Sequence, residues 1–425
     1  MSPNEKTHLL EDAQPKPNKK RGINMNPVCG IDISKEELVA TILGDNFKET
    51  RKFGVHTDEL YKLKQWLKEN HTTQTIMEST GIYWIPIYAS LEASDFKIVL
   101  ANPRQVKGLP KRKTDVRDSE WLAHLLRSGL VKPSYVADAD LRALRSLTRL
   151  RAILVQDQAG YKNKVHKVLQ LSNIRLDSEI TDIFGKSGRI IIEAIATGES
   201  LDKALERCPK SVQKNAQSIK ASIMGKLSQA DLFALKLCMG MVDEFDVKVA
   251  EVDSQIVKYV DDEVIGLLCS VPGVGFVSAA VVVAELGDVS RFADEKAVCS
   301  FCGITPSIRQ SGKRRWNGPI TKFGSKWLRR NLIQCALAAI KVRGDSKFKA
   351  FYLQVRARRG HGVAIVALAR KMLGVMYHLL VKKVAFFEEG LAPKRKWKAI
   401  LERDLSVGFE EAMSLLVNAG YVNGS

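Results

Sequence analysis

Residues 28–43, VCGIDISKEELVATIL, consist of two short apolar runs joined by the polar stretch SKEE. Apolar runs of this length with β-branched residues, divided by a polar turn, are typical of two buried strands that follow one another. The first run contains one acid, Asp32, and a carboxylate is costly inside an apolar strand unless it has a function. This stretch therefore predicts two strands and marks Asp32 as a candidate functional residue.

The sequence on either side of residue 70 continues the alternation of strands and helices. Residues 58–70 have leucines at helical spacing, and TQTIMEST (73–80) is expected to be a strand that ends in a turn. A helix is expected over 84–93, followed by a third short strand, FKIVLAN (96–102), which Pro103 closes. Strands that alternate with helices predict an α/β layer with a central sheet.

After residue 138 the pattern becomes helical. Leucines recur at steps of three and four residues over 139–171, and apolar residues do the same over 237–256. Both stretches predict long amphipathic helices that pair as a hairpin or a coiled coil, either through ordinary core packing or as a dimerising element. Residues 264–286 predict a helix-hairpin-helix, whose Gly273 and Gly275 would let backbone N–H groups approach a phosphate.

We therefore expect an α/β domain followed by all-α regions. The expected segments are a disordered leader (1–24), the α/β domain (25–138), a helical connector (139–262), a mostly helical domain with the helix-hairpin-helix (263–394) and a helical tail (395–425).

Composition limits the class of protein. Among 425 residues, 66 Lys and Arg against 47 Asp and Glu give a net charge of +19, which predicts a polyanionic partner. Charge alone does not separate DNA, RNA and an anionic membrane, and a basic protein without such a partner is the alternative. Seven cysteines without a disulfide framework, no visible secretory signal and no uncharged membrane span favour a reducing cytoplasm. Cys299 and Cys302 are expected to be buried apolar residues.

Four acids are candidates for binding a divalent metal ion. Asp32 and Glu78 belong to predicted strands, and Asp115 and Asp118 stand at i, i+3 on one face at the start of a predicted helix. Carboxylates suit Mg²⁺, and two ions about 4 Å apart can assist phosphoryl transfer. The alternative for Asp115 and Asp118 is that they only complement the helix dipole. A loop rich in basic residues surrounds Asp115, and it favours a phosphodiester substrate. Its basic residues are Arg104, Lys107, Lys111, Arg112, Lys113 and Arg117.

A second candidate site lies in residues 301–330, FCGITPSIRQSGKRRWNGPITKFGSKWLRR. Glycines and a proline break this segment, so we expect a loop that grips phosphate, with Trp316 stacking on a base or sugar. Ser311 is the candidate nucleophile, with a turn residue as the alternative and Ser307 as a competitor. From Arg309 to Arg330 the segment has eight basic residues and no acid: Arg309, Lys313, Arg314, Arg315, Lys322, Lys326, Arg329 and Arg330.

The order of GID, MEST, TDVRDSEWLA, VPGVG, PSIRQSGKRR and ITKFGSKWLRR resembles the DEDD transposases of bacterial insertion sequences. This group includes the pilin-gene invertases and the RNA-guided bridge recombinases, and the resemblance extends from about residue 28 to about residue 345. It implies a nuclease domain with a ribonuclease H-like (Holliday-junction-resolvase-like) fold, a helical coiled-coil connector and a transposase domain.

The resemblance also implies roles for single residues. Asp32, Glu78, Asp115 and Asp118 match the family's metal-binding acids, for Mg²⁺ or Mn²⁺, and Ser311 matches the serine that attaches covalently to DNA. The implied partners are donor and target DNA, a structured non-coding guide RNA and further copies of the chain in a dimer or tetramer.

Three other functions remain as alternatives. A metal-dependent, structure-selective DNA nuclease would use the four acids without a covalent serine intermediate. A non-catalytic RNA- or DNA-binding protein would need none of them. An ATP-dependent sugar or acetate kinase also opens with a GID-type strand, but its second glycine-rich phosphate loop is missing from the sequence.

Overall fold

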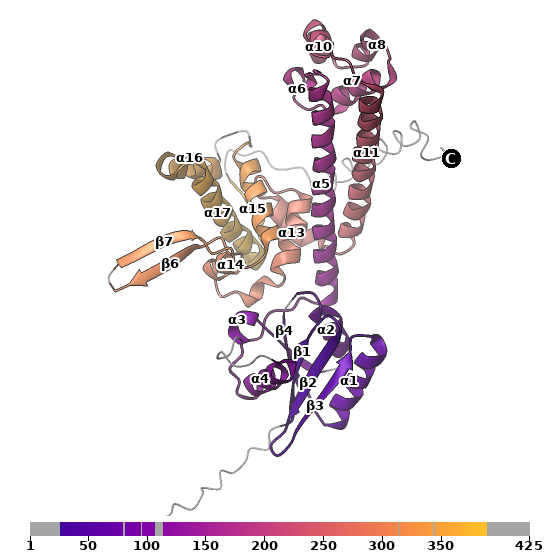
Figure 1. Ribbon diagram of the computed structural model, residues 1–425. Coiled ribbons are helices and arrows are strands. Elements are labelled where there is room, and N and C mark those ends of the chain that lie inside the picture. Colours follow the sequence, from indigo (N-terminus) through magenta and orange to yellow (C-terminus); the bar gives the residue numbers. More distant parts are fainter. Residues whose placement is uncertain are drawn as a thin grey trace, which may run out of the picture. The chain divides into compact units, whose positions relative to one another are not determined.

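The computed structural model describes residues 26–388, apart from 80, 95, 107–113, 313, 343 and 345. The chain forms two compact units, one up to Val136 and one from Ala137 onward (Figure 1). The predicted leader (1–24) and the predicted tail (395–425) lie outside the described residues.

The N-terminal unit is built on a mixed five-stranded sheet with the strand order β3-β2-β1-β4-β5. β1 pairs antiparallel with β2 and parallel with β4, and this is a ribonuclease H-like α/β arrangement, as the family resemblance implied. The strands are β1 (Val28–Ile33), β2 (Glu37–Leu43), β3 (Lys48–Gly54), β4 (Gln74–Glu78) and β5 (Lys97–Ala101).

Helices cover both faces of the sheet. Alternate side chains of β1, Cys29 and Ile31, pack with α1 and α2 in one apolar core, while Val28 packs with Ala123 of α4 on the opposite face. Asp32 shares the α4 face, because side chains two residues apart on a strand point the same way. The helices are α1 (Thr57–Glu69), α2 (Trp84–Glu92), α3 (Pro103–Val106) and α4 (Asp115–Arg127).

The second unit contains two long helices that pair antiparallel, α5 (Ala139–Leu171) and α11 (Gln229–Val257) (Figure 1). The guanidinium of Arg151 binds the carboxylate of Asp253, and further along Gln158 donates to the Val242 carbonyl. The predicted amphipathic stripes therefore pack within one chain.

Between α5 and α11 lie five shorter helices that share an apolar core with the ends of both long helices. They are α6 (Leu176–Glu179), α7 (Lys186–Thr197), α8 (Leu201–Glu206), α9 (Lys210–Gln213) and α10 (Ala216–Ser222).

The rest of the second unit is a helical body around α17 (His361–Lys382). α17 is long and apolar enough to cross a membrane, the one helix of that kind in the described part of the chain. It is nevertheless a core helix here, since nine of its residues are buried against neighbouring helices. The other elements are α12 (Asp262–Cys269), α13 (Phe276–Leu286), a 3₁₀ turn (Val289–Arg291), α14 (Glu295–Phe301), α15 (Lys326–Ala339) and α16 (Lys347–Arg359).

The basic segment predicted to be a loop is instead a β-hairpin. β6 (Pro306–Ser311) pairs antiparallel with β7 (Arg314–Ile320), and Gly312 occupies the turn at a φ of +55°. A two-residue turn with a positive φ fits the twist of the two strands that it joins. Two glycines that we attributed to an irregular loop thus belong to the hairpin, Gly312 to its turn and Gly318 to β7.

The cysteines have the structural role that the sequence predicted. All seven are buried and none forms a disulfide. Cys299 is 3% exposed and Cys302 is fully buried, and burial raises the pKa of both thiols, so they are kept as neutral apolar groups.

Candidate functional site

Two of the predicted acids stand at the ends of adjoining parallel strands. β1 and β4 are paired so that Ile31 lies opposite Met77, and the next residues along the two strands are Asp32 and Glu78. Adjacent strands are ~4.8 Å apart, and residues at equivalent positions point to the same face. The two carboxylates, both half-buried, therefore stand side by side at the carboxyl edge of the sheet.

The other two acids, Asp115 and Asp118, lie in the first turn of α4. This helix crosses the sheet face that carries Gly30 and Asp32, and it lies unusually close. A Cβ atom on Gly30 would come within 2.0 Å of the Ser119 carbonyl oxygen. The missing side chain of Gly30 is thus what lets the helix backbone approach β1.

The direction of α4 follows from its contacts with β2. Near its start, the Ser119 hydroxyl lies 2.7 Å from the hydroxyl of Thr41, which is paired with Gly30. At its end, Arg127 donates to the carbonyl of Gly44, just past the far end of β2. α4 therefore runs antiparallel to β1, and its acidic first turn lies toward the carboxyl edge of the sheet.

The electrostatics of Asp32 reflect this gathering of acids. Burial and repulsion from three other carboxylates raise the pKa of Asp32 from 3.8 to about 6. The repelling carboxylates, in order of effect, are those of Asp118, Asp115 and Glu78. No lysine or arginine in the described part of the chain forms an ion pair with Asp32, Asp115 or Asp118.

The four acids supply hard oxygen donors but do not form a closed coordination shell. Repulsion between carboxylates acts over several Å, whereas the ligand oxygens of Mg²⁺ lie about 2.0–2.1 Å from the ion. Among the described residues, no three Asp, Glu, His or Cys side chains are close enough to hold one ion. The four side chains would have to come closer together to share an ion, and a divalent ion would offset the repulsion between their carboxylates.

Of the six basic residues predicted beside Asp115, the structure describes the side chain of Arg117, which is exposed on α4. The Trp121 indole donates to the Val106 carbonyl at 2.9 Å and so holds the end of α3 against α4. Of Arg104 only the backbone is described. The remaining four lie outside the described residues: Lys107, Lys111, Arg112 and Lys113.

Ser311 ends β6 and is exposed at the hairpin turn, where it is paired with Arg314. Its hydroxyl forms no hydrogen bond with any residue that the structure describes. The competing Ser307 is half-buried, and its hydroxyl donates to the Pro319 carbonyl at 3.0 Å. Of the two serines, Ser311 is the accessible one.

The hairpin presents cationic and aromatic groups together. Arg309 is paired with Trp316, a residue that is 54% exposed, and Arg314 is exposed beside the turn. Lys313 and the side chain of Arg315 lie outside the described residues. Cations beside an exposed indole are typical of surfaces that bind a nucleic-acid backbone and stack on its bases.

The basic residues after the hairpin differ in what they can bind. Lys322, Lys326 and Arg330 are exposed. The guanidinium of Arg329 instead donates from one nitrogen to three backbone carbonyls, those of Cys302, Phe323 and Gly324. Arg329, predicted as a nucleic-acid contact, thus stabilises the turn that follows β7.

Helices α12 and α13 flank the PGVG turn, as the predicted helix-hairpin-helix requires. Gly273 has a φ of +83°, and a Cβ atom there would come within 2.5 Å of the Cys335 carbonyl oxygen on α15. Close packing on α15 therefore accounts for Gly273. Gly275 is exposed at the start of α13, and phosphate binding by these glycines stays a prediction.

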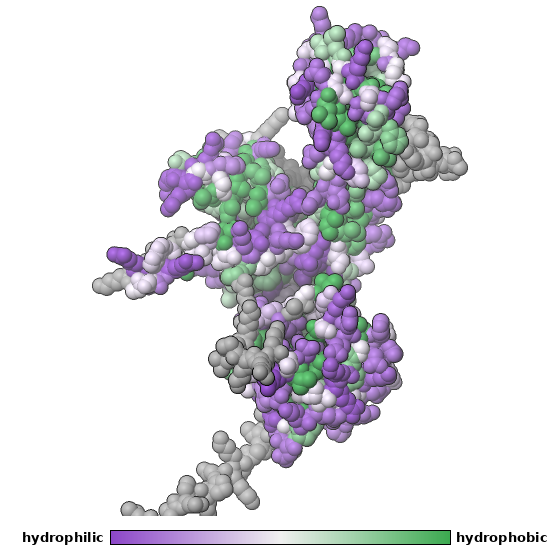
Figure 2. Space-filling model, viewed as in Figure 1, coloured by the Kyte–Doolittle hydropathy of each residue, from purple (hydrophilic) through white to green (hydrophobic). Residues whose placement is uncertain are grey.

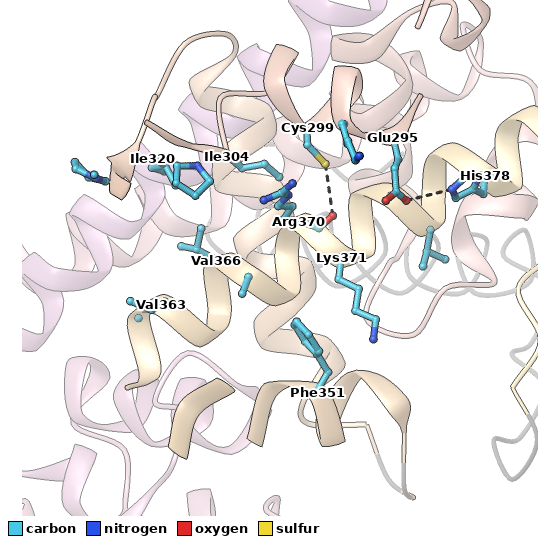
Figure 3. A pocket seen from close by; sticks show the side chains of 18 residues that line it. Glu295, Cys299, Ile304, Ile320, Phe351, Val363, Val366, Arg370, Lys371 and His378 are labelled. Carbon is cyan, nitrogen blue, oxygen red and sulfur yellow. Dashed lines mark hydrogen bonds and ion pairs between the residues drawn. The ribbon is translucent and has the colours of Figure 1, made fainter. Parts of the chain in front are cut away.

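Sequence inspection missed an apolar groove of about 830 Å³ at the base of the hairpin (Figure 3). At one end of it, His378 lies 3.1 Å from the Glu295 carboxylate. On the surface, apolar side chains gather over α17 (Figure 2). The residues that line the groove come from separate elements, which explains why no local sequence pattern indicated the groove. They include Ile304, Ile320, Phe351, Val363 and Val366.

Two family profiles match the two parts of the chain that hold these residues. A profile described as "Transposase", for DEDD transposases of the IS110 type, matches residues 29–174, which contain the four acids. A profile described as "Transposase IS116/IS110/IS902 family" matches residues 266–353, which contain Ser311.

Curated relatives have related names. The chain is similar to a "Probable family 20 transposase" of Pseudomonas aeruginosa, with 25% identity over 73% of this chain and 84% of the relative. It is 33% identical, over 28% of this chain and 33% of the relative, to the transposase for insertion sequence element IS1111A of Coxiella burnetii. A "Pilin gene-inverting protein" of Moraxella bovis is 22% identical over 83% of this chain and 94% of the relative.

Proposed function

This chain belongs to the IS116/IS110/IS902 family of transposases, which are DNA strand-transfer enzymes, and from this premise we propose how it cuts and rejoins DNA. We propose a divalent-metal site formed by Asp32, Glu78, Asp115 and Asp118, together with a nucleophilic Ser311. The observation that carries the proposal is that Asp32 and Glu78 lie at the carboxyl ends of adjoining strands, on the edge toward which the acidic first turn of α4 extends. A phosphodiester approaching this edge would meet all four carboxylates.

The four acids would bind Mg²⁺ or Mn²⁺, and we propose two ions. Bound there, the ions supply Lewis-acid stabilisation of the oxygens that attack and leave the phosphorus. Asp32 and Glu78 provide the fixed half of the set, since the sheet holds their backbone. Asp115 and Asp118 provide the half that α4 brings in.

In the proposed reaction, the Ser311 hydroxyl oxygen attacks a DNA phosphorus. The Oγ–P bond forms while one bond between phosphorus and a sugar oxygen breaks. The serine proton is released, and the departing sugar oxygen takes up a proton. Rejoining is the reverse step with the hydroxyl of a new strand end, so the phosphodiester bond energy is retained and no nucleotide is consumed. The guanidinium groups of Arg309 and Arg314 flank the serine and would neutralise the phosphate charge.

The proposed partners follow from the two-unit organisation and from the resemblance. The acids belong to one unit and Ser311 to the other, so a serine from one copy of the chain can serve the acids of another copy in a dimer or tetramer. We also propose that donor and target DNA are selected by a structured non-coding RNA, on the basis of the motif order alone. The reaction would take place in the bacterial cytoplasm, as transposition or, as in the relatives named for pilin-gene inversion, as inversion.

A covalent-trapping experiment tests the nucleophile. The chain is incubated with Mg²⁺, labelled DNA carrying the junctions that flank its gene, and RNA transcribed from the adjacent non-coding stretch. Denaturing gels should show a protein–DNA adduct that Ser311→Ala abolishes. Ser307→Ala is the matched control, because that hydroxyl lies on the same strand and is engaged with Pro319, and it should keep the adduct. An adduct that persists in Ser311→Ala would refute the proposed nucleophile.

A second candidate is a metal-dependent, structure-selective nuclease without a covalent step. It is favoured by the N-terminal unit, which forms a compact ribonuclease H-like body that contains all four acids. This function predicts that Ser311→Ala cleaves at the full rate, whereas Asp32→Asn is inactive. The same gels therefore distinguish the two functions.

A further inference from the structure

A row of three hydroxyl groups, of which two are fully buried, connects the sheet to the first turn of α4. Thr41 Oγ1 lies 2.9 Å from Thr50 Oγ1 on the neighbouring strand and 2.7 Å from Ser119 Oγ on the helix. Ser119 Oγ in turn donates to the Val116 carbonyl at 2.9 Å. Thr41 and Ser119 are both fully buried.

Each hydroxyl has one proton to donate, and this fixes the direction of the row. Because Ser119 donates to Val116, Thr41 must donate to Ser119 and Thr50 to Thr41. Every donor in the row is then satisfied. A buried hydroxyl that loses its partner is costly, so the row holds α4 at one height above the sheet.

The row ends in the first turn of α4, the turn that carries Asp115 and Asp118. Val116 follows Asp115 directly, and Ser119 follows Asp118 directly. On the sheet below, Gly30 of β1 and Thr41 of β2 are directly paired across the two strands. A Cβ atom on Gly30 would lie 2.0 Å from the Ser119 carbonyl oxygen, so α4 packs directly against the backbone of Gly30.

We propose that Thr41 and Ser119, with Gly30 beneath them, are positioning residues for the metal site. They hold the first turn of α4 at the height from which Asp115 and Asp118 reach an ion bound by Asp32 and Glu78. This inference rests on the proposed function, because it presupposes that the four acids bind metal. Groups that orient metal ligands typically change metal affinity 10–100-fold when removed.

The chain contains a matched control for Thr41. Thr75 is also a fully buried threonine of a central strand, but its hydroxyl has no hydrogen-bond partner in the described structure. It is paired with Cys29 and so faces the side of the sheet opposite α4. Thr75→Val and Thr41→Val are therefore the same chemical change, and only the second interrupts the row.

Mn²⁺ binding to the full-length chain is the measurement, by isothermal titration calorimetry without DNA. We expect Thr41→Val to weaken Mn²⁺ affinity at least about tenfold. Thr41→Ser, which keeps the hydroxyl, and Thr75→Val should bind as the wild type does. Circular dichroism of each variant checks that it is folded. Gly30→Ala is a harsher test of the same contact, and Thr41→Val remains informative if Gly30→Ala does not fold.

The outcomes separate the two claims. Equal Mn²⁺ affinity in Thr41→Val and Thr75→Val, with wild-type binding that Asp32→Asn abolishes, would refute the positioning role and leave the metal site standing. Wild-type binding that survives in Asp32→Asn, or no binding at all, would overturn the metal site and with it the positioning role.

Discussion

Replacing Asp32 with asparagine should make the metal-free protein more stable at neutral pH. The carboxylate is half-buried and is repelled by three other acids, which raises its pKa from 3.8 to about 6. That difference corresponds to ~3 kcal/mol. Because the side chain is partly exposed, solvent screening reduces the figure to ~1–2 kcal/mol. Asparagine has nearly the same shape and no charge, so it removes this repulsion.

The sign can be checked against pH. The pKa of Asp32 is higher in the folded chain than in the unfolded chain, so the folded state binds more protons between about pH 4 and pH 6. The stability of the metal-free wild type therefore falls as pH rises through this window. The asparagine variant lacks this fall, and the two proteins should differ most above pH 6 and converge below pH 4.

The assay is differential scanning calorimetry of the metal-free full-length chain at pH 7.5 and at pH 4, following the transition of the N-terminal unit. At pH 7.5 the Tm of Asp32→Asn should exceed that of the wild type by several degrees. Mg²⁺ should then stabilise the wild type and not the variant, because an ion that binds only the folded state raises its stability. Asp45→Asn is a control that should lower the Tm, since it loses an ion pair with Arg127. A Tm for Asp32→Asn at or below the wild type at pH 7.5 would refute the reasoning.

Three further outcomes can be measured on the second unit. Glu285→Ala should cost about 2 kcal/mol in urea unfolding, because it removes a buried carboxylate that accepts two hydrogen bonds from Arg149; an unchanged midpoint would contradict this. Leu144→Ala, at a fully buried position where α5 joins the helical body, should cost ~3 kcal/mol by the same assay. Arg314→Ala should weaken DNA binding, measured by fluorescence anisotropy, and reduce the slope of the logarithm of the binding constant against log salt by about 1. Arg329→Ala should instead lower the Tm and leave that slope unchanged.

The long helices were predictable because their patterns are long. The leucine pattern of residues 139–171 coincides with the bounds of α5, since more than 30 residues repeat one period and Asp138 caps the first turn. The short strands β1, β4 and β5 were predictable for a different reason: their apolar runs are buried on both faces.

Strands that bury few side chains were missed. β3 has the sequence KETRKFG and lies at the sheet edge, where charged side chains face solvent and no apolar alternation remains. The β6–β7 hairpin was missed because both of its faces are largely exposed, so its glycines and basic residues resembled a loop. In both cases backbone pairing, rather than burial, defines the strand.

The sequence named the four acids, and an open α/β sheet predicts that they converge at the carboxyl edges of neighbouring strands, but the sequence does not give the strand register. Asp32 and Glu78 become neighbours only through the parallel register of β1 and β4, which depends on residues more than 40 positions apart. The position of α4 depends on Gly30, whose lack of a side chain looks unremarkable within an apolar strand. A glycine two residues before an acid in such a strand is a signal that a helix packs there, and it could have been used.

The most direct test of the account is to locate Mn²⁺ by anomalous diffraction from crystals of the full-length chain soaked in MnCl₂. The account predicts a peak within about 2.0–2.3 Å of carboxylate oxygens of Asp32 and Glu78, with a carboxylate oxygen of Asp115 or Asp118 completing the site. Manganese bound elsewhere, with these four carboxylates left without an ion, would contradict it.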